Sequence, residues 1–192
     1  MSQGFSARTI LPRAFYERDP VAVAREVLGA LLVHRLDGET RVGRIVETEA
    51  YVTEYQGEPD RAAHAHRGLT PRTRVLFGPG GHAYVYFIYG MYDCLNLVAE
   101  PPGTPGCVLV RALEPVSGVA ASCSGPGRLT RAMGITRAHY GADLTSRRSA
   151  LTLHAGEPAA DAAIGVSGRI GIRHGADWPL RFYLRGNTSV SG

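Results

Sequence analysis

Residues 83–98, with the sequence AYVYFIYGMYDCLNLV, constrain the fold of this chain more than any other stretch. Aromatic and branched residues dominate two runs on either side of Gly90, a pattern that favours two β-strands joined by a tight turn. Side chains alternate between the faces of a strand, so Tyr84, Tyr86 and Ile88 share one face of the first run. The sequence therefore predicts a β-hairpin around which the rest of the sheet is organised.

Tyr89 is the hairpin residue that core packing explains least well. Most tyrosines in such a stretch are core residues, because the ring buries well and the hydroxyl group usually finds a hydrogen-bond partner. Tyr89 precedes Gly90 at the expected turn, where a large ring would project outward. Two interpretations stay open from the residues alone: an exposed wedge that enters a partner, or a buried core ring.

The segments around the hairpin predict a single domain of mixed α and β structure. Asp19 and Pro20 supply an N-cap and a first-turn proline for a helix that Gly29 ends. Further strands are expected at residues 31–36, 40–49, 107–113, 166–172 and 180–184. Residues 124–127 are expected to open a short helix that continues through Met133 and is ended by Gly134. Residues 1–13 are predicted to be a flexible arm, and the polar residues 52–82 a long functional loop.

Composition places the protein in a broad class. Of its 192 residues, 44% are hydrophobic, which is enough for a core. No stretch reaches the roughly 18 apolar residues of a membrane span, and residues 1–8 lack the apolar run of a signal peptide. We therefore expect a cytoplasmic protein with no membrane partner, whose three cysteines are reduced and buried: Cys94, Cys107 and Cys123.

The charged residues permit a polyanionic partner and exclude one kind of chemistry. The net charge is +4 and the pI is about 9.2. All 21 positively charged residues are arginine, so no lysine side chain is available for Schiff-base chemistry. Phosphate groups would have to be bound by guanidinium groups, hydroxyl groups or backbone amides.

Two acidic and two basic residues are candidates for chemistry. Glu47 and Glu49 share one face of a predicted strand, where they are either catalytic or simply solvated at the strand end. His64 and His66 form a pair without a third ligand of matching type, so no metal site is expected.

Arginines and free amides indicate where an anion could bind. Arg67, Arg72 and Arg74 in the long loop either contact phosphates or form a solvated face. Residues 124–128 combine free backbone amides with Arg128 at a helix start, which suits an anion.

Several separated motifs together resemble those of the alkyladenine (3-methyladenine) DNA glycosylase family. They are GRIVETEAY at residues 43–51, AAH at 62–64, TPR at 70–72, YVY at 84–86, YGMY at 89–92, VLVRALEP at 108–115, SGP at 124–126 and LRFYLRG at 180–186. Cys94 and Asn96 match as well. The order and spacing of the motifs agree with the family from residue 8 to near the C-terminus.

The resemblance implies a fold and an activity. The fold would be mixed α/β (α+β): one domain with a curved, mainly antiparallel sheet, surrounding helices and a protruding hairpin whose tip enters the minor groove. The protein would be a monofunctional DNA glycosylase that flips a damaged purine out of double-stranded DNA and hydrolyses its N-glycosidic bond in base excision repair. Substrates would include 3-methyladenine, 7-methylguanine, hypoxanthine and ethenoadenine. The enzyme would act as a monomer and need no cofactor or metal.

The resemblance also implies residue roles at matching positions. Glu49 would deprotonate the attacking water, with Arg111 beside it, whereas Glu47 has no equivalent role. Asn96 would crowd the pocket against the exocyclic amine of guanine. The flipped base would be held by Tyr51, His64 and Tyr86. DNA contacts would come from Tyr89, which fills the gap left in the duplex, and from Met91, Arg72, Arg74 and Arg128.

Two alternative functions belong to other classes. A non-catalytic module that binds damaged DNA would not need Glu49, and a hydrolase of free nucleosides would not need Tyr89 or the arginines. Excision assays on duplex oligonucleotides and on free nucleosides separate all three.

Overall fold

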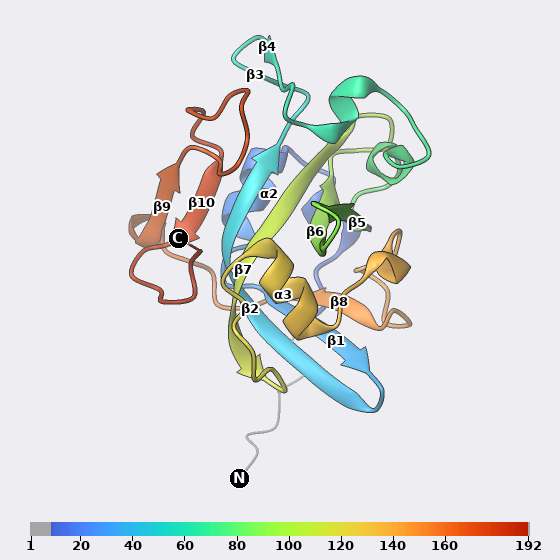
Figure 1. The fold of residues 1–192 in the computed structure, drawn as a ribbon, viewed down its shortest axis with the longest axis vertical. Coiled ribbons are helices and arrows are strands. Elements are labelled where there is room, and N and C mark those ends of the chain that lie inside the picture. The colour runs from blue at the N-terminus through green and yellow to red at the C-terminus, as the bar shows by residue number, and fades with distance from the viewer. Residues whose placement is uncertain (1–8, 192) are drawn as a thin grey trace.

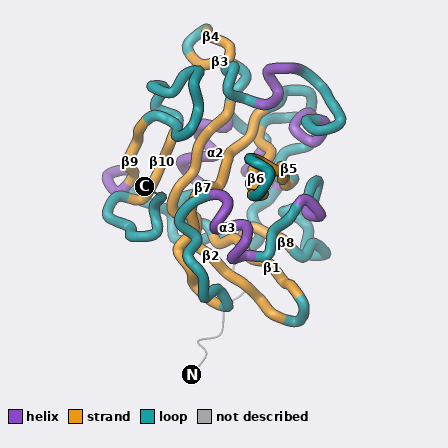
Figure 2. The backbone as a smooth tube through the Cα atoms, viewed as in Figure 1, coloured by secondary structure: helices purple, strands orange, loops and turns teal. Residues whose placement is uncertain are grey.

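The computed structural model describes residues 9–191, which form one eight-stranded antiparallel sheet with helices packed around it (Figures 1 and 2). The strands are β1 (Leu31–Leu36), β2 (Glu39–Tyr51), β5 (Ala83–Ile88), β6 (Tyr92–Ala99), β7 (Gly106–Ser117), β8 (Leu151–His154), β9 (Ile164–Ser167) and β10 (Arg181–Leu184). Their order is β5-β6-β7-β2-β1-β8, and β10 pairs with both β2 and β9. The predicted mixed α/β, mainly antiparallel fold class is confirmed.

The prediction that the sheet is organised around the β5–β6 hairpin is wrong, because the hairpin lies at one edge of the sheet. Strand β2 is the central element, since it is long enough to pair with three other strands. Its first part pairs with β1, its later part with β10, and β7 pairs along most of its length. Ile45, Val46 and Ala50 of β2 are completely buried. The strand therefore carries its neighbouring polar residues into the interior of the molecule.

Within the described residues, three short α-helices pack on the sheet: α1 (Arg13–Tyr16), α2 (Pro20–Glu26) and α3 (Pro126–Met133). The Asp19 side chain caps α2 by accepting a hydrogen bond from the backbone N–H of Val21, as predicted. Gly134 ends α3 in the left-handed conformation, with φ of 72°. In Figure 1, α3 lies in front of the sheet and α2 behind it.

The hairpin of β5 and β6 ends in an exposed turn. Ile88 and Tyr92 form its last pair, and Tyr89 and Gly90 in the turn have positive φ angles of 55° and 69°. The Tyr89 side chain is 76% exposed. The prediction of a hairpin with an outward ring is confirmed, and the interpretation of Tyr89 as a core residue is wrong.

The prediction of a flexible arm at residues 1–13 is wrong for residues 9–13, the part that the structure describes. Residues 1–8 lie outside the described residues. Beyond them, Ile10 makes an antiparallel bridge with His154, and the backbone N–H of Leu11 donates to the carbonyl of Leu153 at 2.9 Å. The segment is fixed because it pairs with β8, a strand that the sequence left unassigned.

The strand predicted at residues 166–172 is only partly correct. Strand β9 ends at Ser167, and the chain then leaves the sheet. A Cβ atom on Gly168 would lie 2.0 Å from the carbonyl oxygen of Ala176, and Gly171 has a φ of 76°. Both positions favour glycine, and the residues between Ser167 and β10 form a loop instead of a strand.

The long polar segment at residues 52–82 contains only short elements, as predicted. They are β3 (Glu54–Tyr55), β4 (Glu58–Pro59), and the 3-10 helices η1 (His64–Arg67) and η2 (Arg74–Phe77). Later loops contain η3 (Arg137–His139) and η4 (Asp161–Ala163). The three cysteines are buried, with free thiol groups. Among residues 9–191, no helix has the length and apolar character needed to span a membrane.

Candidate active site

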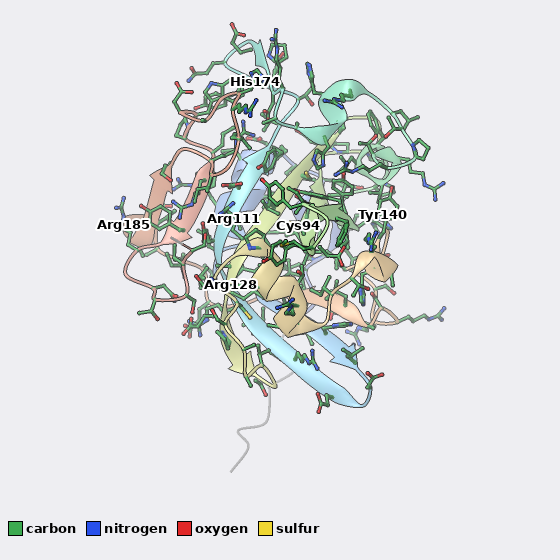
Figure 3. The ribbon with its side chains drawn as sticks, viewed as in Figure 1. Cys94, Arg111, Arg128, Tyr140, His174 and Arg185 are labelled. Carbon is green, nitrogen blue, oxygen red and sulfur yellow. The ribbon has the colours of Figure 1, made fainter. Side chains whose placement is uncertain are left out.

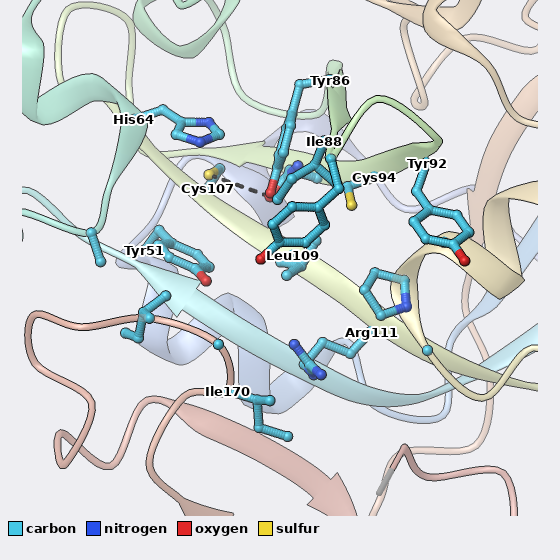
Figure 4. Close-up of a pocket in the computed structure, with 18 of the residues that line it drawn as sticks. Tyr51, His64, Tyr86, Ile88, Tyr92, Cys94, Cys107, Leu109, Arg111 and Ile170 are labelled. Carbon is cyan, nitrogen blue, oxygen red and sulfur yellow. Dashed lines mark hydrogen bonds between the residues drawn. The ribbon is translucent and has the colours of Figure 1, made fainter.

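A cavity of about 560 Å³ lies between the β5–β6 hairpin, β7, the loop after β9 and the start of α3 (Figures 3 and 4). Most predicted site residues line it: Tyr51, His64, Tyr86, Tyr89, Asn96, Arg111 and Arg128. Glu49 is completely buried behind the cavity wall, in contact with the lining residues Tyr51, Arg111 and Ile170. The fold thus gathers residues from distant parts of the chain around one space.

Glu47 and Glu49 lie on β2, and neither carboxylate is exposed to solvent. The Arg111 guanidinium joins them, because its Nε lies 2.9 Å from Glu47 Oε1 and its Nη1 lies 3.2 Å from Glu49 Oε1. The alternative that these are solvated strand-end carboxylates is therefore wrong. Buried charges need partners of opposite sign, and here two anions share a cation.

A β-bulge places Arg111 next to the two carboxylates. In the pairing of β2 with β7, Glu47 is opposite Ala112, whereas the next residue, Thr48, is opposite Val110. Arg111 is thus skipped in the register. Bulges occur next to active sites, and this one lies where Arg111 contacts both carboxylates of β2.

Glu47 is held as a fixed anion. Its Oε1 accepts hydrogen bonds from Arg181 Nε at 2.7 Å and Ser191 Oγ at 2.8 Å, and its Oε2 accepts one from the Ser191 backbone N–H at 2.6 Å. Burial raises the pKa of Glu47, but the hydrogen bonds from Ser191 and Arg181 and the charge of Arg111 outweigh it. The pKa therefore lies below its ordinary value.

Glu49 has fewer compensating partners. Its Oε1 accepts a hydrogen bond from the Ile170 backbone N–H at 2.7 Å, and its Oε2 accepts one from the Tyr51 hydroxyl at 3.0 Å. Burial raises the pKa of Glu49 above its ordinary value, in spite of these bonds and of Arg111. Two neighbouring carboxylates whose pKa values move apart are typical of acid–base sites. Glu49, next to the cavity, is the one suited to accept a proton.

Aromatic rings give the cavity its flat apolar walls. The rings of His64 and Tyr86 meet edge to face, with their centres 4.5 Å apart, and Tyr51 lies beside them in Figure 4. The hydroxyl of Tyr84, a fully buried residue that the sequence analysis did not include in the site, lies 2.8 Å from His64 Nδ1. Burial, with the nearby arginines, lowers the pKa of His64 to about 4. The imidazole is therefore neutral at neutral pH.

An ion pair behind Tyr51 is a second feature that the sequence did not indicate. The buried Arg169 donates to both carboxylate oxygens of Asp60, at 2.6 and 2.9 Å, and its guanidinium carbon lies 4.7 Å from the centre of the Tyr51 ring. Asp60 directly follows β4, so the pair joins the long polar segment at residues 52–82 to the loop after β9. The partners are 109 positions apart, so no local spacing could have indicated the contact.

Asn96 on β6 lines the cavity but is only 2% exposed. Its Nδ2 donates to the backbone carbonyl of Tyr84 at 3.1 Å. The Cys107 thiol donates to Asn96 Oδ1 at 3.8 Å, and the dashed line that starts at Cys107 in Figure 4 marks this bond.

The predicted DNA contacts lie in three places. Tyr89 and Met91 at the hairpin tip are 76% and 61% exposed. Arg72 and Arg74 are exposed in the long loop, and the Arg72 guanidinium carbon lies 5.2 Å from the centre of the Tyr86 ring. Arg128, at the start of α3, is exposed and lines the cavity, whereas Met91, Arg72 and Arg74 do not line it.

The donor set of the cavity does not resemble a metal centre. In the part of the chain that the structure describes, no three His, Cys, Asp or Glu side chains are placed to bind one metal ion. What the cavity offers is a buried carboxylate, a guanidinium group and an aromatic slot. These groups can activate water beside a planar ring.

Comparisons with known proteins point to one family. The family described as "Methylpurine-DNA glycosylase (MPG)" matches residues 14–188. A protein of Myxococcus xanthus is 49% identical over 186 residues, which is 94% of this chain and 93% of the relative. A protein of Methanoculleus marisnigri is 48% identical, covering 94% of this chain and 98% of the relative. One of Carboxydothermus hydrogenoformans is 45% identical, covering 95% and 98%. All three relatives are named, provisionally, 3-methyladenine DNA glycosylases.

Proposed function

The chain belongs to the methylpurine-DNA glycosylase family, and on this premise we propose that it excises alkylated and deaminated purines from duplex DNA, with Glu49 as the base that activates water. The protein is a DNA glycosylase, and its substrate is DNA. The single observation that carries the residue assignment is the Glu49 carboxylate, buried behind the cavity wall and 3.2 Å from Arg111 Nη1.

The recessed site supports base flipping. A purine stacked inside a duplex cannot reach a carboxylate that lies behind Tyr51 and Arg111, so the nucleotide must leave the helix. Extrusion costs a few kcal/mol, and a ring inserted into the vacated stack offsets part of that cost. Tyr89 is both exposed at the hairpin tip and part of the cavity lining, which suits this task.

The proposed reaction is a displacement by water at C1′ of the deoxyribose. Glu49 accepts a proton from the water while the water oxygen bonds to C1′, and the electron pair of the N-glycosidic bond leaves with the purine. The sugar becomes oxocarbenium-like, and a carboxylate also stabilises that positive charge. General-base catalysis contributes a factor of roughly 10²–10⁴. Arg111 holds Glu49 in place through their ion pair.

Selection among purines would operate in two steps. Damaged bases pair weakly, so they cost less to flip. Inside the cavity, alkylated purines are electron-poor and stack well on the electron-rich rings of Tyr51 and Tyr86. Asn96 crowds the position of the 2-amino group and so excludes normal guanine.

The experiment that tests this proposal is Glu49→Gln in single-turnover excision on duplexes with one lesion. Excision should be abolished while lesion binding is largely retained, because a general base contributes to the transition state more than to the ground state. Glu39→Gln, on the exposed start of β2, is the matched control and should excise like the wild type. Appreciable excision by Glu49→Gln would refute the assignment, and cleavage of free nucleosides as fast as duplex lesions would favour the nucleoside hydrolase.

A further inference from the structure

Resting on the proposed function, we propose that the Cys107 thiol is a specificity-determining group, which keeps the Asn96 amide from accepting a hydrogen bond from the 2-amino group of guanine. Cys107 lies on β7, beside Asn96 on the neighbouring strand β6, and both residues line the cavity.

The orientation of the Asn96 amide follows from its backbone partner. Nδ2 lies 3.1 Å from the carbonyl oxygen of Tyr84, which can only accept a hydrogen bond. A flipped amide would place Oδ1 against that carbonyl, so two acceptors would face each other. Oδ1 must therefore point away from β5, to the side where Cys107 lies.

An unoccupied Asn96 Oδ1 would weaken the discrimination against guanine. An amide oxygen has two acceptor sites, and the 2-amino group of guanine is a donor. A free Oδ1 would therefore attract the group that the filter has to reject. The structure supplies a competing donor from within the protein, because Cys107 Sγ lies 3.8 Å from Oδ1.

The thiol is suited to be a permanent donor. Cys107 is 7% exposed, and burial, with the charge of Asp60, raises the pKa of its thiol to about 12. The sulfur therefore keeps its proton under all ordinary assay conditions. The thiol occupies one of the two acceptor sites of Oδ1, so it competes with an incoming amino group for this oxygen.

The test compares hypoxanthine with guanine, two bases that differ by the 2-amino group alone. Single-turnover excision of each, opposite thymine in the same duplex, gives a discrimination ratio. Cys107→Ala should lower this ratio about tenfold, the scale for small changes in a packed pocket, with hypoxanthine excision little changed. Cys107→Ser, which keeps a hydrogen-bond donor, should lose less discrimination than Cys107→Ala.

Cys123→Ala is the matched control. Cys123 is also a buried cysteine, but it does not line the cavity, and its thiol donates to the backbone carbonyl of Ala121 at 3.7 Å. The control should keep the wild-type ratio. A ratio unchanged in Cys107→Ala, equal ratios in Cys107→Ala and Cys107→Ser, or an equal loss in Cys123→Ala would each overturn the inference.

The Asn96→Ser variant distinguishes the proposed role of the Cys107 thiol from the proposed glycosylase function on which it rests. If Asn96→Ser loses discrimination and Cys107→Ala does not, Asn96 acts without the thiol and this inference alone fails. If neither the wild type nor any variant excises hypoxanthine, the proposal that the enzyme acts on deaminated purines is refuted, whatever the role of Cys107.

Discussion

Glu47 and Glu49 lie close together on β2 and share Arg111, yet their hydrogen bonds assign them different tasks. Glu47 also binds Arg181 and Ser191, which makes it a structural anion that fixes the position of Arg111. Glu49 keeps a raised pKa and faces the lining residues. The family resemblance implies a catalytic role for Glu49, and the hydrogen bonds in the structure give Glu47 a structural role.

Glu47→Gln should lower the free energy of unfolding at neutral pH by about 3 kcal/mol, the scale for removing one partner of a buried ion pair. The pKa of Glu47 is lowered on folding, so its ionised form stabilises the fold above the unfolded-state value near 4.5. That contribution is lost as the pH falls through the lowered pKa. Urea unfolding of wild type and variant should therefore converge at low pH. Glu39→Gln, on the exposed start of β2, should change stability by less than about 1 kcal/mol.

The pH dependence of excision should report Glu49. Its pKa is raised above the ordinary value of 4.5, and the general base must be ionised. The single-turnover rate for hypoxanthine should therefore fall, with decreasing pH, at a midpoint above 4.5. Circular dichroism at each pH controls for unfolding. A rate that is constant down to pH 4.5 in folded protein would contradict the role of Glu49.

The sequence predicts some site residues well because they belong to continuous motifs. Tyr51 and Glu49 are in one strand, and Tyr86 and Asn96 are in one hairpin, so local patterns locate them. Other residues act through contacts between distant segments. Ser191 reaches Glu47 from the far end of the described chain, and nothing in the composition of either neighbourhood indicates that pair.

At the scale of elements, the hairpin and the loop after β9 illustrate two outcomes. Alternating aromatic residues and Gly90 define the β5–β6 hairpin locally, so its strands and turn could be predicted. The run after Ser167 has the β-branched residues of a strand, but Gly168 and Gly171 take conformations and close contacts that only tertiary structure reveals. That loop brings the Ile170 N–H to Glu49.

Tyr89→Ser tests the hairpin as a separate functional element. Specific binding to a lesion duplex should weaken by roughly 1–3 kcal/mol, the scale for base–aromatic stacking. The melting temperature should stay near that of the wild type, because the ring is 76% exposed. Val116→Ser, an exposed apolar residue near the end of β7, is the control for lost surface area and should bind normally. A collapse of the thermal transition in Tyr89→Ser would show that the ring stabilises the fold instead.

At the scale of the whole molecule, charge and composition limit how the protein can treat DNA. The net charge is +4, and all 21 positively charged residues are arginine, so side-chain charges can contact phosphates only through guanidinium groups. Such contacts release counterions, so binding should weaken with salt. The same composition leaves no lysine side chain for Schiff-base chemistry on DNA.

The absence of lysine predicts that this glycosylase leaves an intact abasic site. A bifunctional glycosylase displaces the base with an amine, forms a Schiff base with C1′ and then cuts the strand, whereas water leaves the strand whole. No lysine occurs in the 192 residues, and the cavity offers Glu49 with a neutral His64 instead of an amine. Product duplex on a denaturing gel should therefore stay uncut until alkali or a separate endonuclease is added, and borohydride should trap no complex. Enzyme-dependent cutting together with a trapped adduct would contradict the water mechanism, and mapping the adduct would identify the amine responsible.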